Sequence, residues 1–275
     1  MTQGLFRSLF PAFSLAFLMA LFLALAACGG ARAPDQPAAV PAVEVIWPNF
    51  SDADPHPWAG QDPAHHPVHG VDVSRYQTSV DWEVARENGV NFAFIKATEG
   101  GDMVDPMFKD HWRGAGAAGV KRGAYLFYYH CRPPEEQARW FFRHVPRVAG
   151  SLPPVLDMEW TPTSPTCTIR REASVIRRDA AKVIAMMTEH YGTAPILYTT
   201  VDFYEDNEMW RLSGVDFWLR SVAAHPSDRY PGQHWRFWQY TSTGLVPGMK
   251  GEIDINAFDG SREDWANWLA RRVAP

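Results

Sequence analysis

From Gly70 onward, short apolar runs alternate with longer amphipathic stretches, and this alternation limits the fold more than any other feature of the chain. It is typical of parallel strands joined by crossover helices, the arrangement of α/β proteins. Eight strands are expected, over residues 70–73, 92–96, 123–128, 154–158, 194–198, 216–220, 236–240 and 252–255. Their order favours a barrel over an open sheet.

Helices are expected over residues 81–88, 107–118, 135–145, 169–191 and 262–272. The first four fit between the first five strands, and the last closes the chain. After the fifth strand the connections shorten and lose the helical period. The sequence therefore predicts an α/β fold, an irregular TIM-like barrel with eight strands and about five helices, in one domain over residues 68–275.

The amino-terminal segment has the pattern of a targeting signal. Arg7 precedes an apolar run over residues 9–27, which ends in small residues directly before Cys28. This resembles a bacterial lipoprotein signal, in which residues 1–27 are removed and Cys28 is acylated as a membrane anchor. A retained transmembrane helix is the alternative, because the run approaches the roughly 20 residues that cross a bilayer. In either case the domain is expected in the cell envelope, facing the periplasm or the cell exterior.

Residues 28–67 are rich in Pro and Ala, have almost no apolar periodicity, and predict an extended tether. His65, His66 and His69 cluster at its end, but no carboxylate scaffold accompanies them, so a solvated linker is expected rather than a metal site. The net charge of -5 disfavours nucleic acid as a partner. No metal or cofactor is expected, and the protein is expected to be a monomer.

Cys131 and Cys167 are predicted to form a disulfide, since an exported chain meets oxidising conditions. One follows the third expected strand and the other the fourth, so they lie on neighbouring loops at the same rim. Their bond would close a loop of about 36 residues and contribute roughly 3 to 4 kcal/mol. Two separate thiols are the alternative, and a zinc site is disfavoured because two cysteines without matching histidines cannot complete its shell.

Acidic residues recur at the carboxyl ends of the expected strands, where parallel barrels place their active sites. They are Asp72, Glu99, Asp157, Glu159 and Asp254. Asp157 and Glu159 stand two positions apart, so their side chains point to the same face, roughly 6 to 7 Å apart along the strand. The two carboxyl groups are expected to face one cavity.

Two carboxyl groups in a partly dry cavity repel, so one keeps its proton at a pH at which an isolated group would lose it. Glycosidic cleavage needs both forms, since one group protonates the leaving oxygen while the other stabilises or attacks the oxocarbenium centre. The longer Glu159 is assigned as the acid. The alternative is a pair of rim acids neutralised by Lys96 or Arg75, without a catalytic role.

Six ordered motifs resemble those of glycoside hydrolase family 25, the N-acetylmuramidases. They are GVDVS at 70–74, FIKATEG at 94–100, GAY at 123–125, PPVLDME at 153–159, WQYT at 238–241 and DIN at 254–256. The resemblance covers nearly the whole expected domain. It implies a flattened eight-stranded barrel that hydrolyses peptidoglycan at the β-1,4 bond between N-acetylmuramic acid and N-acetylglucosamine, without metal or cofactor.

By this resemblance, Glu159 is the proton donor, Asp157 stabilises the intermediate, and Asp72 and Asp254 flank the pocket. Glu99 is a secondary catalytic candidate, because it could instead pair with Lys96. Whether Asp157 bonds to the sugar or orients the substrate's N-acetyl group stays open, and either route retains configuration. A catalytically silent peptidoglycan-binding lipoprotein is the alternative function.

Substrate contacts are expected from Tyr125, Tyr198, Trp218, Gln239 and Lys96. A place in the core is the alternative for each aromatic residue, and for single aromatics it is the commoner one. Arg220 departs from the family's commoner pattern, which has a small residue at this position, and leaves the substrate contacts there open.

Overall fold

The computed structural model describes Met1 and residues 43–273. Apart from Met1, the expected signal segment 1–27, Cys28 and the first part of the expected tether lie outside the described residues. Within the described part, no helix has both the length and the apolar character that crossing a membrane requires.

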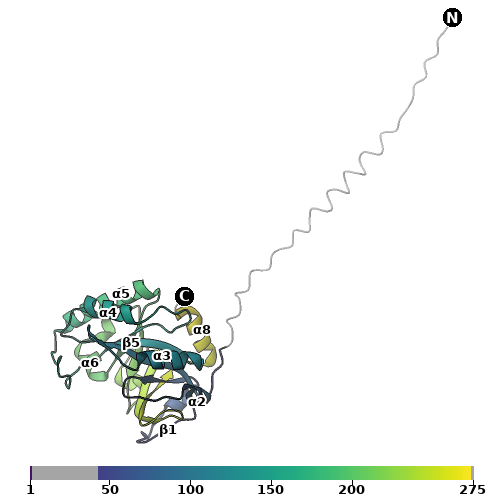
Figure 1. Ribbon diagram of the computed structural model, residues 1–275, viewed down its shortest axis with the longest axis horizontal. Helices are drawn as coiled ribbons and strands as arrows, with labels where there is room; N and C mark the ends of the chain where they lie inside the picture. Colours follow the sequence, from purple (N-terminus) through teal and green to yellow (C-terminus); the bar gives the residue numbers. More distant parts are fainter. Residues whose placement is uncertain (2–42, 274–275) are drawn as a thin grey trace. The chain divides into compact units, whose positions relative to one another are not determined.

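Eight strands close into a barrel, which confirms the fold class expected from the sequence (Figure 1). In chain order they are β2 (His69–Val73), β3 (Val90–Glu99), β5 (Lys121–Phe127), β6 (Val155–Met158), β7 (Ile196–Thr199), β8 (Asp216–Arg220), β9 (Phe237–Leu245) and β10 (Ile253–Phe258). Neighbouring strands from β2 to β9 pair in parallel. Two short strands, β1 (Ser51–Asp52) and β4 (Met103–Val104), add to β9 and β3.

The last strand, β10, differs from its expected orientation. It lies between β9 and β2 and is antiparallel to both, so Asp254 stands near its amino end and not at a carboxyl end. The reversed direction still brings Asp254 to the end of the barrel where the parallel strands finish, and there it pairs in register with Asp72. An apolar run predicts a strand but not its direction, because pairing with neighbours decides the direction.

Helices cover the barrel on its outside. In the described residues they are α2 (Trp82–Glu87), α3 (Phe108–Ala117), α4 (Pro134–His144), α5 (Ala173–Tyr191), α6 (Val201–Asp206), α7 (Pro226–Arg229) and α8 (Arg262–Arg272), with two 3-10 turns, η1 (Pro63–His65) and η2 (Met209–Arg211). The five expected helices are present. The two additional α-helices, α6 and α7, have six and four residues, too few to show a helical period in the sequence.

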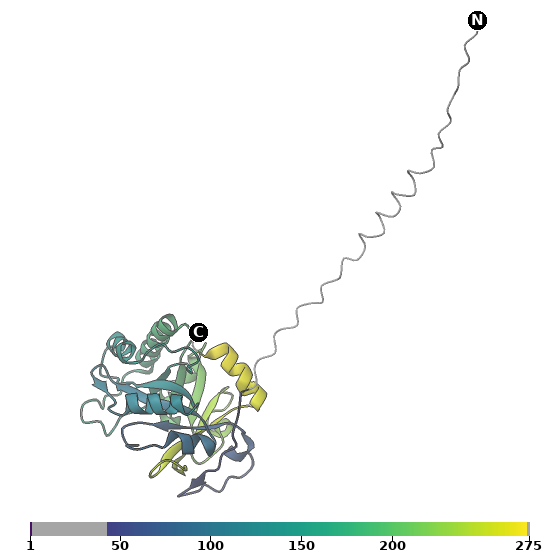
Figure 2. The same cartoon turned by 45° about the vertical axis from the view of Figure 1, so that its right-hand side comes forward.

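Two pairs of contacts show how these helices are fixed. The helices α4 and α5 lie side by side (Figure 1), and the rings of Phe142 and His190 stack between them at 4.2 Å. The helix α8, yellow in Figure 2, begins with a capping box in which Ser261 and Asp264 each accept from the other's backbone N–H.

Side chains at alternate strand positions fill the inside of the barrel. Phe92 and Phe94 of β3 pack there against Phe237 of β9, each with ring centroids 5.1 Å from it. Trp265 of α8 lies 5.7 Å from Phe92 and is fully buried. The helix α8 thus closes the amino end of the barrel with aromatic rings and leaves the opposite end for polar residues.

The second half of the expected tether is part of the folded unit. Ile46 exchanges hydrogen bonds of 2.9 and 2.8 Å with the side chain of Asn91, and the ring of Trp58 lies 5.1 Å from that of Trp238. His69, expected in a solvated linker, is buried in β2 and bonds Tyr240. These contacts involve backbone groups and single rings, which leave no periodic apolar pattern in the sequence.

Candidate active site

The carboxyl ends of the parallel strands bring the predicted acids to one rim of the barrel. Asp157 is opposite Tyr198 in the β6–β7 pairing, and Asp72 is opposite Asp254 in the β2–β10 pairing. Glu159 follows directly after β6. Strand alternation turns the side chains of Asp72 and Asp157 into the barrel, above the aromatic interior. The fold therefore brings together the acids that were expected at the ends of the strands.

Asp72 is held by a chain of buried amides. Its Oδ2 accepts hydrogen bonds from Gln239 Nε2 at 2.9 Å and Asn256 Nδ2 at 2.8 Å. Tyr198 donates to Gln239 at 2.9 Å, and the Trp218 indole donates to Asn256 at 2.7 Å. Each amide thus accepts a hydrogen bond from an aromatic side chain and donates one to Asp72. These bonds fix the Asp72 carboxyl group in the wall of the site.

Two residues of this site received no assigned role from the sequence. Asn256 donates a hydrogen bond to Asp72. Its position two residues after Asp254 in the same strand could have indicated that its side chain faces the site. Arg220 ends β8 opposite Gln239, and its charge lowers the pKa of Glu159 and of Asp254. The signal for Arg220 was its departure from the family's commoner small residue.

Burial raises the pKa of Glu159, Asp254 and Asp157. It raises the pKa of Glu159 to about 7, against the lowering effect of Arg220 and Lys96. It raises the pKa of Asp254 to about 6, also against Arg220. Asp157 has a pKa well above its usual range because of burial first and the neighbouring Glu159 second, while Lys96 acts in the opposite direction.

One oxygen of Asp157 remains available. Its Oδ1 is buried and has no hydrogen-bond partner among the described residues. A buried carboxyl oxygen without a partner is costly, so such an atom marks a place where a ligand could bind. The site therefore combines a group that keeps its proton to about pH 7 with a second carboxyl group that can receive a donor from a substrate.

Glu99, the secondary candidate, is already engaged. Lys96 Nζ donates to its Oε2 at 2.6 Å, and the hydroxyl of Tyr129 donates to its Oε1. Burial raises the pKa of Glu99, but these two hydrogen bonds and the Lys96 charge outweigh it, and the pKa is lowered. Glu99 is thus an anion beside Lys96, which itself lies 4.2 Å from the centroid of the Phe127 ring.

The three aromatic residues expected at the substrate lie deep in the barrel. Trp218 is only 2% exposed, and its ring lies 4.5 Å from those of Phe94 and Tyr198. Tyr125 and Tyr198 are 8% and 6% exposed. Trp218 therefore packs in the core, which was the alternative expected for a single aromatic residue. The two tyrosines lie just below the acids.

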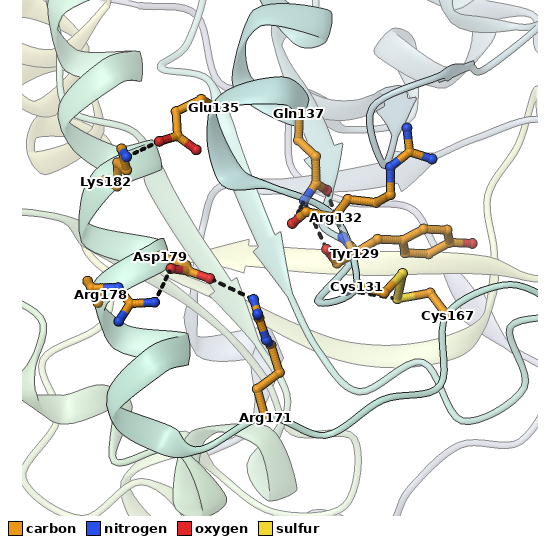
Figure 3. A network of polar contacts seen from close by, with 10 residues as sticks. All are labelled: Tyr129, Cys131, Arg132, Glu135, Gln137, Cys167, Arg171, Arg178, Asp179 and Lys182. Carbon is orange, nitrogen blue, oxygen red and sulfur yellow. Dashed lines mark hydrogen bonds and ion pairs between the residues drawn. A yellow bond between two sulfur atoms is a disulfide. The ribbon is translucent and has the colours of Figure 1, made fainter.

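A disulfide joins the two loops next to Glu159, as predicted. Cys131 and Cys167 are bonded, with their Cα atoms 5.7 Å apart, and the bond is visible in Figure 3. Between them and the site, Nε2 of His130 lies 3.0 Å from the backbone oxygen of Glu159. Thr161 donates to the backbone oxygen of Cys167. The disulfide thus fixes the segment that carries Glu159.

Helices α4 and α5 support the same loop from outside. The side chain of Gln137 exchanges hydrogen bonds of 2.8 and 2.9 Å with the backbone of Tyr129 (Figure 3). Lys182 of α5 pairs with Glu135 of α4, and Asp179 binds Arg171 at 3.2 Å.

In residues 43–273, no group of three or more His, Cys, Asp or Glu side chains is placed to hold a metal ion.

The comparison with known proteins gives the family. The model of glycosyl hydrolases family 25 matches residues 71–249, well over half of the 275 residues. The chain belongs to this family. This member of family 25 is accordingly a glycoside hydrolase, and the matched range contains Asp72, Glu99, Asp157 and Glu159.

Relatives of this family 25 protein come from several bacteria. It is 36% identical to the uncharacterized protein YegX of Escherichia coli K12 over 210 residues, 74% of this chain and 73% of that protein. It is 34% identical to lysozyme M1 of Streptomyces globisporus over 211 residues, 70% and 68% of the two chains. A family 25 glycosyl hydrolase from Bacillus anthracis has a similar structure, with a TM-score of 0.69, 34% identity and coverage of 79% and 98%.

Proposed function

We propose that this protein is an N-acetylmuramidase, a peptidoglycan hydrolase with lysozyme activity. It cleaves the β-1,4 bond between N-acetylmuramic acid and N-acetylglucosamine. Family membership and similarity to a protein named as a lysozyme support this proposal. The observation that carries it is the pairing of Glu159, whose pKa is about 7, with Asp157, whose Oδ1 has no partner in the described chain.

In the first step, Glu159 acts as the general acid. Because its pKa is raised to about 7, it still holds a proton at neutral pH, where an ordinary glutamate is ionised. It donates this proton to the glycosidic oxygen as the bond to the anomeric carbon breaks. Arg220 and Lys96 keep the pKa from rising further, so that the proton can still be released.

In the same step, Asp157 stabilises the charge that develops on the sugar. Burial and Glu159 raise the pKa of Asp157, and the Lys96 ammonium opposes that rise. The Oδ1 atom accepts the N–H of the substrate's acetamido group, whose carbonyl oxygen attacks the anomeric carbon. Water then opens the resulting ring, and Glu159 takes up a proton from that water, so the product retains its configuration. Asp72 and Asp254 form the adjoining wall.

We further propose that the protein works in the cell envelope as a monomeric lipoprotein anchored through Cys28. The apolar run over residues 9–27 and the small residues before Cys28 support this proposal. Mass spectrometry of the amino-terminal peptide from membranes tests it. A diacylglyceryl group on Cys28 is the expected result, and a peptide that still contains residues 1–27 would contradict it.

The activity is tested with purified sacculi and the full chain in detergent. New reducing ends are expected on N-acetylmuramic acid, released by the parent and by the control Glu189→Gln, an exposed residue of α5. Glu159→Gln is expected to release none. Reducing ends on N-acetylglucosamine would assign a different bond. Binding of sacculi without products from any variant would favour the alternative, a silent wall-binding protein.

A further inference from the structure

The side chain of Arg220 has no partner of its own in the candidate active site. Arg220 ends β8 and is only partly exposed, and its guanidinium makes no hydrogen bond or ion pair with any described residue. Lys96, which also acts on the acids, is already paired with Glu99. A guanidinium has several N–H donors and cannot lose its charge in a protein. An unpaired guanidinium beside a catalytic site therefore marks a place where an anionic ligand can bind.

The strand β8 turns Arg220 toward the acids. Alternate residues of a strand share a face, so Asp216, Trp218 and Arg220 point to the same side. Asp216 accepts a hydrogen bond from Trp268 of α8 at the closed end of the barrel, and Trp218 packs in the barrel interior. Arg220 is opposite the inward-facing Gln239 in the β8–β9 pairing. Its side chain therefore starts from the inner face of the barrel, at the end that carries the acids.

Arg220 also stands at the same level of the barrel as Glu159. Asp157 of β6 is opposite Tyr198 of β7, which is opposite Trp218 of β8. Glu159 and Arg220 each follow two residues later in the chain. They are thus two strands apart at one level, with a backbone separation of roughly 9 to 10 Å. A sugar ring with a side group fits a gap of this width.

The electrostatic effects agree with this placement. Burial raises the pKa of Glu159 to about 7 and that of Asp254 to about 6, and the Arg220 charge opposes both increases. Below pH 7, Glu159 is mainly uncharged and so is not a counterion for Arg220. Neither acid forms an ion pair with the guanidinium. The positive charge therefore remains available for an anion that enters the site.

The proposed substrate carries anions of the matching kind. Each N-acetylmuramic acid unit has a lactyl ether whose carboxyl group is either free or joined to a peptide stem, and the stem has carboxylates of its own. N-acetylglucosamine has no carboxyl group. A guanidinium binds a carboxylate through two parallel N–H···O bonds. A cation beside the acids can therefore distinguish the two sugars of the glycan strand.

We propose that Arg220 is a specificity-determining residue that binds a carboxylate group of the glycan substrate, from the lactyl ether or from the peptide stem. This inference rests on the proposed function. The backbone of Arg220 is fixed in advance, since its oxygen accepts from the Tyr230 hydroxyl at 2.6 Å and the next residue, Ser221, donates its N–H to the oxygen of Gln239 at 2.9 Å. A cation on an ordered backbone needs little further ordering when the carboxylate binds, and this favours affinity.

The test compares soluble glycan strands that differ in their carboxylates. The first kind keeps its peptide stems, the second has been stripped by an amidase and has free lactyl carboxylates, and in the third these carboxylates are converted to methylamides. Arg220→Gln is expected to raise KM on carboxylate-bearing strands about tenfold, which corresponds to about 1.4 kcal/mol, and to leave KM on the methylamide unchanged. A rise confined to stripped strands assigns the lactyl group, and one confined to the first kind assigns the stem.

Further variants separate binding from other roles of Arg220. Arg220→Lys keeps the charge and should recover part of the affinity. Arg229→Gln, at an exposed arginine of α7, is the matched control and should behave like the parent. The same rise in KM on all three strands, or a change in kcat alone, would overturn the proposal.

Calorimetric binding of the same strands to the full chain carrying Glu159→Gln, in detergent, makes the readout independent of catalysis. Tighter binding of a carboxylate-bearing strand than of the methylamide, lost when Arg220→Gln is added, is the expected result. This preference would support the role of Arg220 even where the parent hydrolyses no strand and the proposed function fails. Hydrolysis without any such preference would leave the muramidase intact and refute the carboxylate contact.

Discussion

Lys96 donates a hydrogen bond of 2.6 Å to Glu99, and the same ammonium charge lowers the pKa of Asp157 and Glu159. The Lys96 ammonium thus pairs with the buried Glu99 carboxylate and also opposes the rise in the pKa of Asp157 and Glu159. Lys96→Met is expected to leave Glu99 as an unpaired buried charge and to cost about 3 kcal/mol of unfolding free energy. Urea unfolding measures this loss. The double variant Lys96→Met, Glu99→Gln should recover part of it, and additive losses would contradict the coupling.

The pH dependence of hydrolysis should follow Glu159. Above its pKa of about 7 the proton donor is lost, so kcat/KM on soluble glycan strands is expected to fall on the alkaline side with an apparent pKa of about 7. The Arg220 charge lowers this pKa, so Arg220→Gln should move the alkaline limb to higher pH. A limb that stays in place or moves to lower pH would contradict this assignment.

Glu159 should also make the fold less stable as the pH rises. Its folded pKa of about 7 exceeds the usual value of 4.5, so between these values the folded state binds more protons than the unfolded state. Stability is then lost as the pH rises through this window. At pH 8, Glu159→Gln is expected to raise the unfolding free energy by about 3 kcal/mol, with little effect at pH 4. Glu189→Gln should change neither value.

The disulfide should affect both stability and catalysis. Replacing Cys131 and Cys167 with Ala is expected to lower the unfolding free energy by about 3 kcal/mol, mainly because the unfolded chain gains freedom. It should also lower kcat, since the bonded loops hold the backbone of Glu159 next to His130. Urea unfolding and hydrolysis assays measure the two effects. The parent in reductant should match the variant, and unchanged stability would contradict this account.

The sequence predicted the barrel and its rim of acids because both depend on local patterns. Apolar runs predicted the strands. Asp157 and Glu159 were expected on the same face because alternate residues of a strand point to the same side. The direction of β10, the roles of Asn256 and Arg220, and the folding of residues 43–67 onto β9 depend on contacts between distant parts of the chain. The core position of Trp218 also follows from its neighbours and not from its spacing.

The antiparallel strand β10 has a consequence for how the enzyme is produced. It comes near the end of the chain but pairs with β2 near the start, and it supplies Asn256, 184 residues away from Asp72. Contacts of such separation form late and slowly. A nascent or clipped chain that lacks residues 253–258 therefore has an open barrel and an incomplete acid wall. The acid wall is therefore completed only when residues 253–258 have paired with β2 and β9.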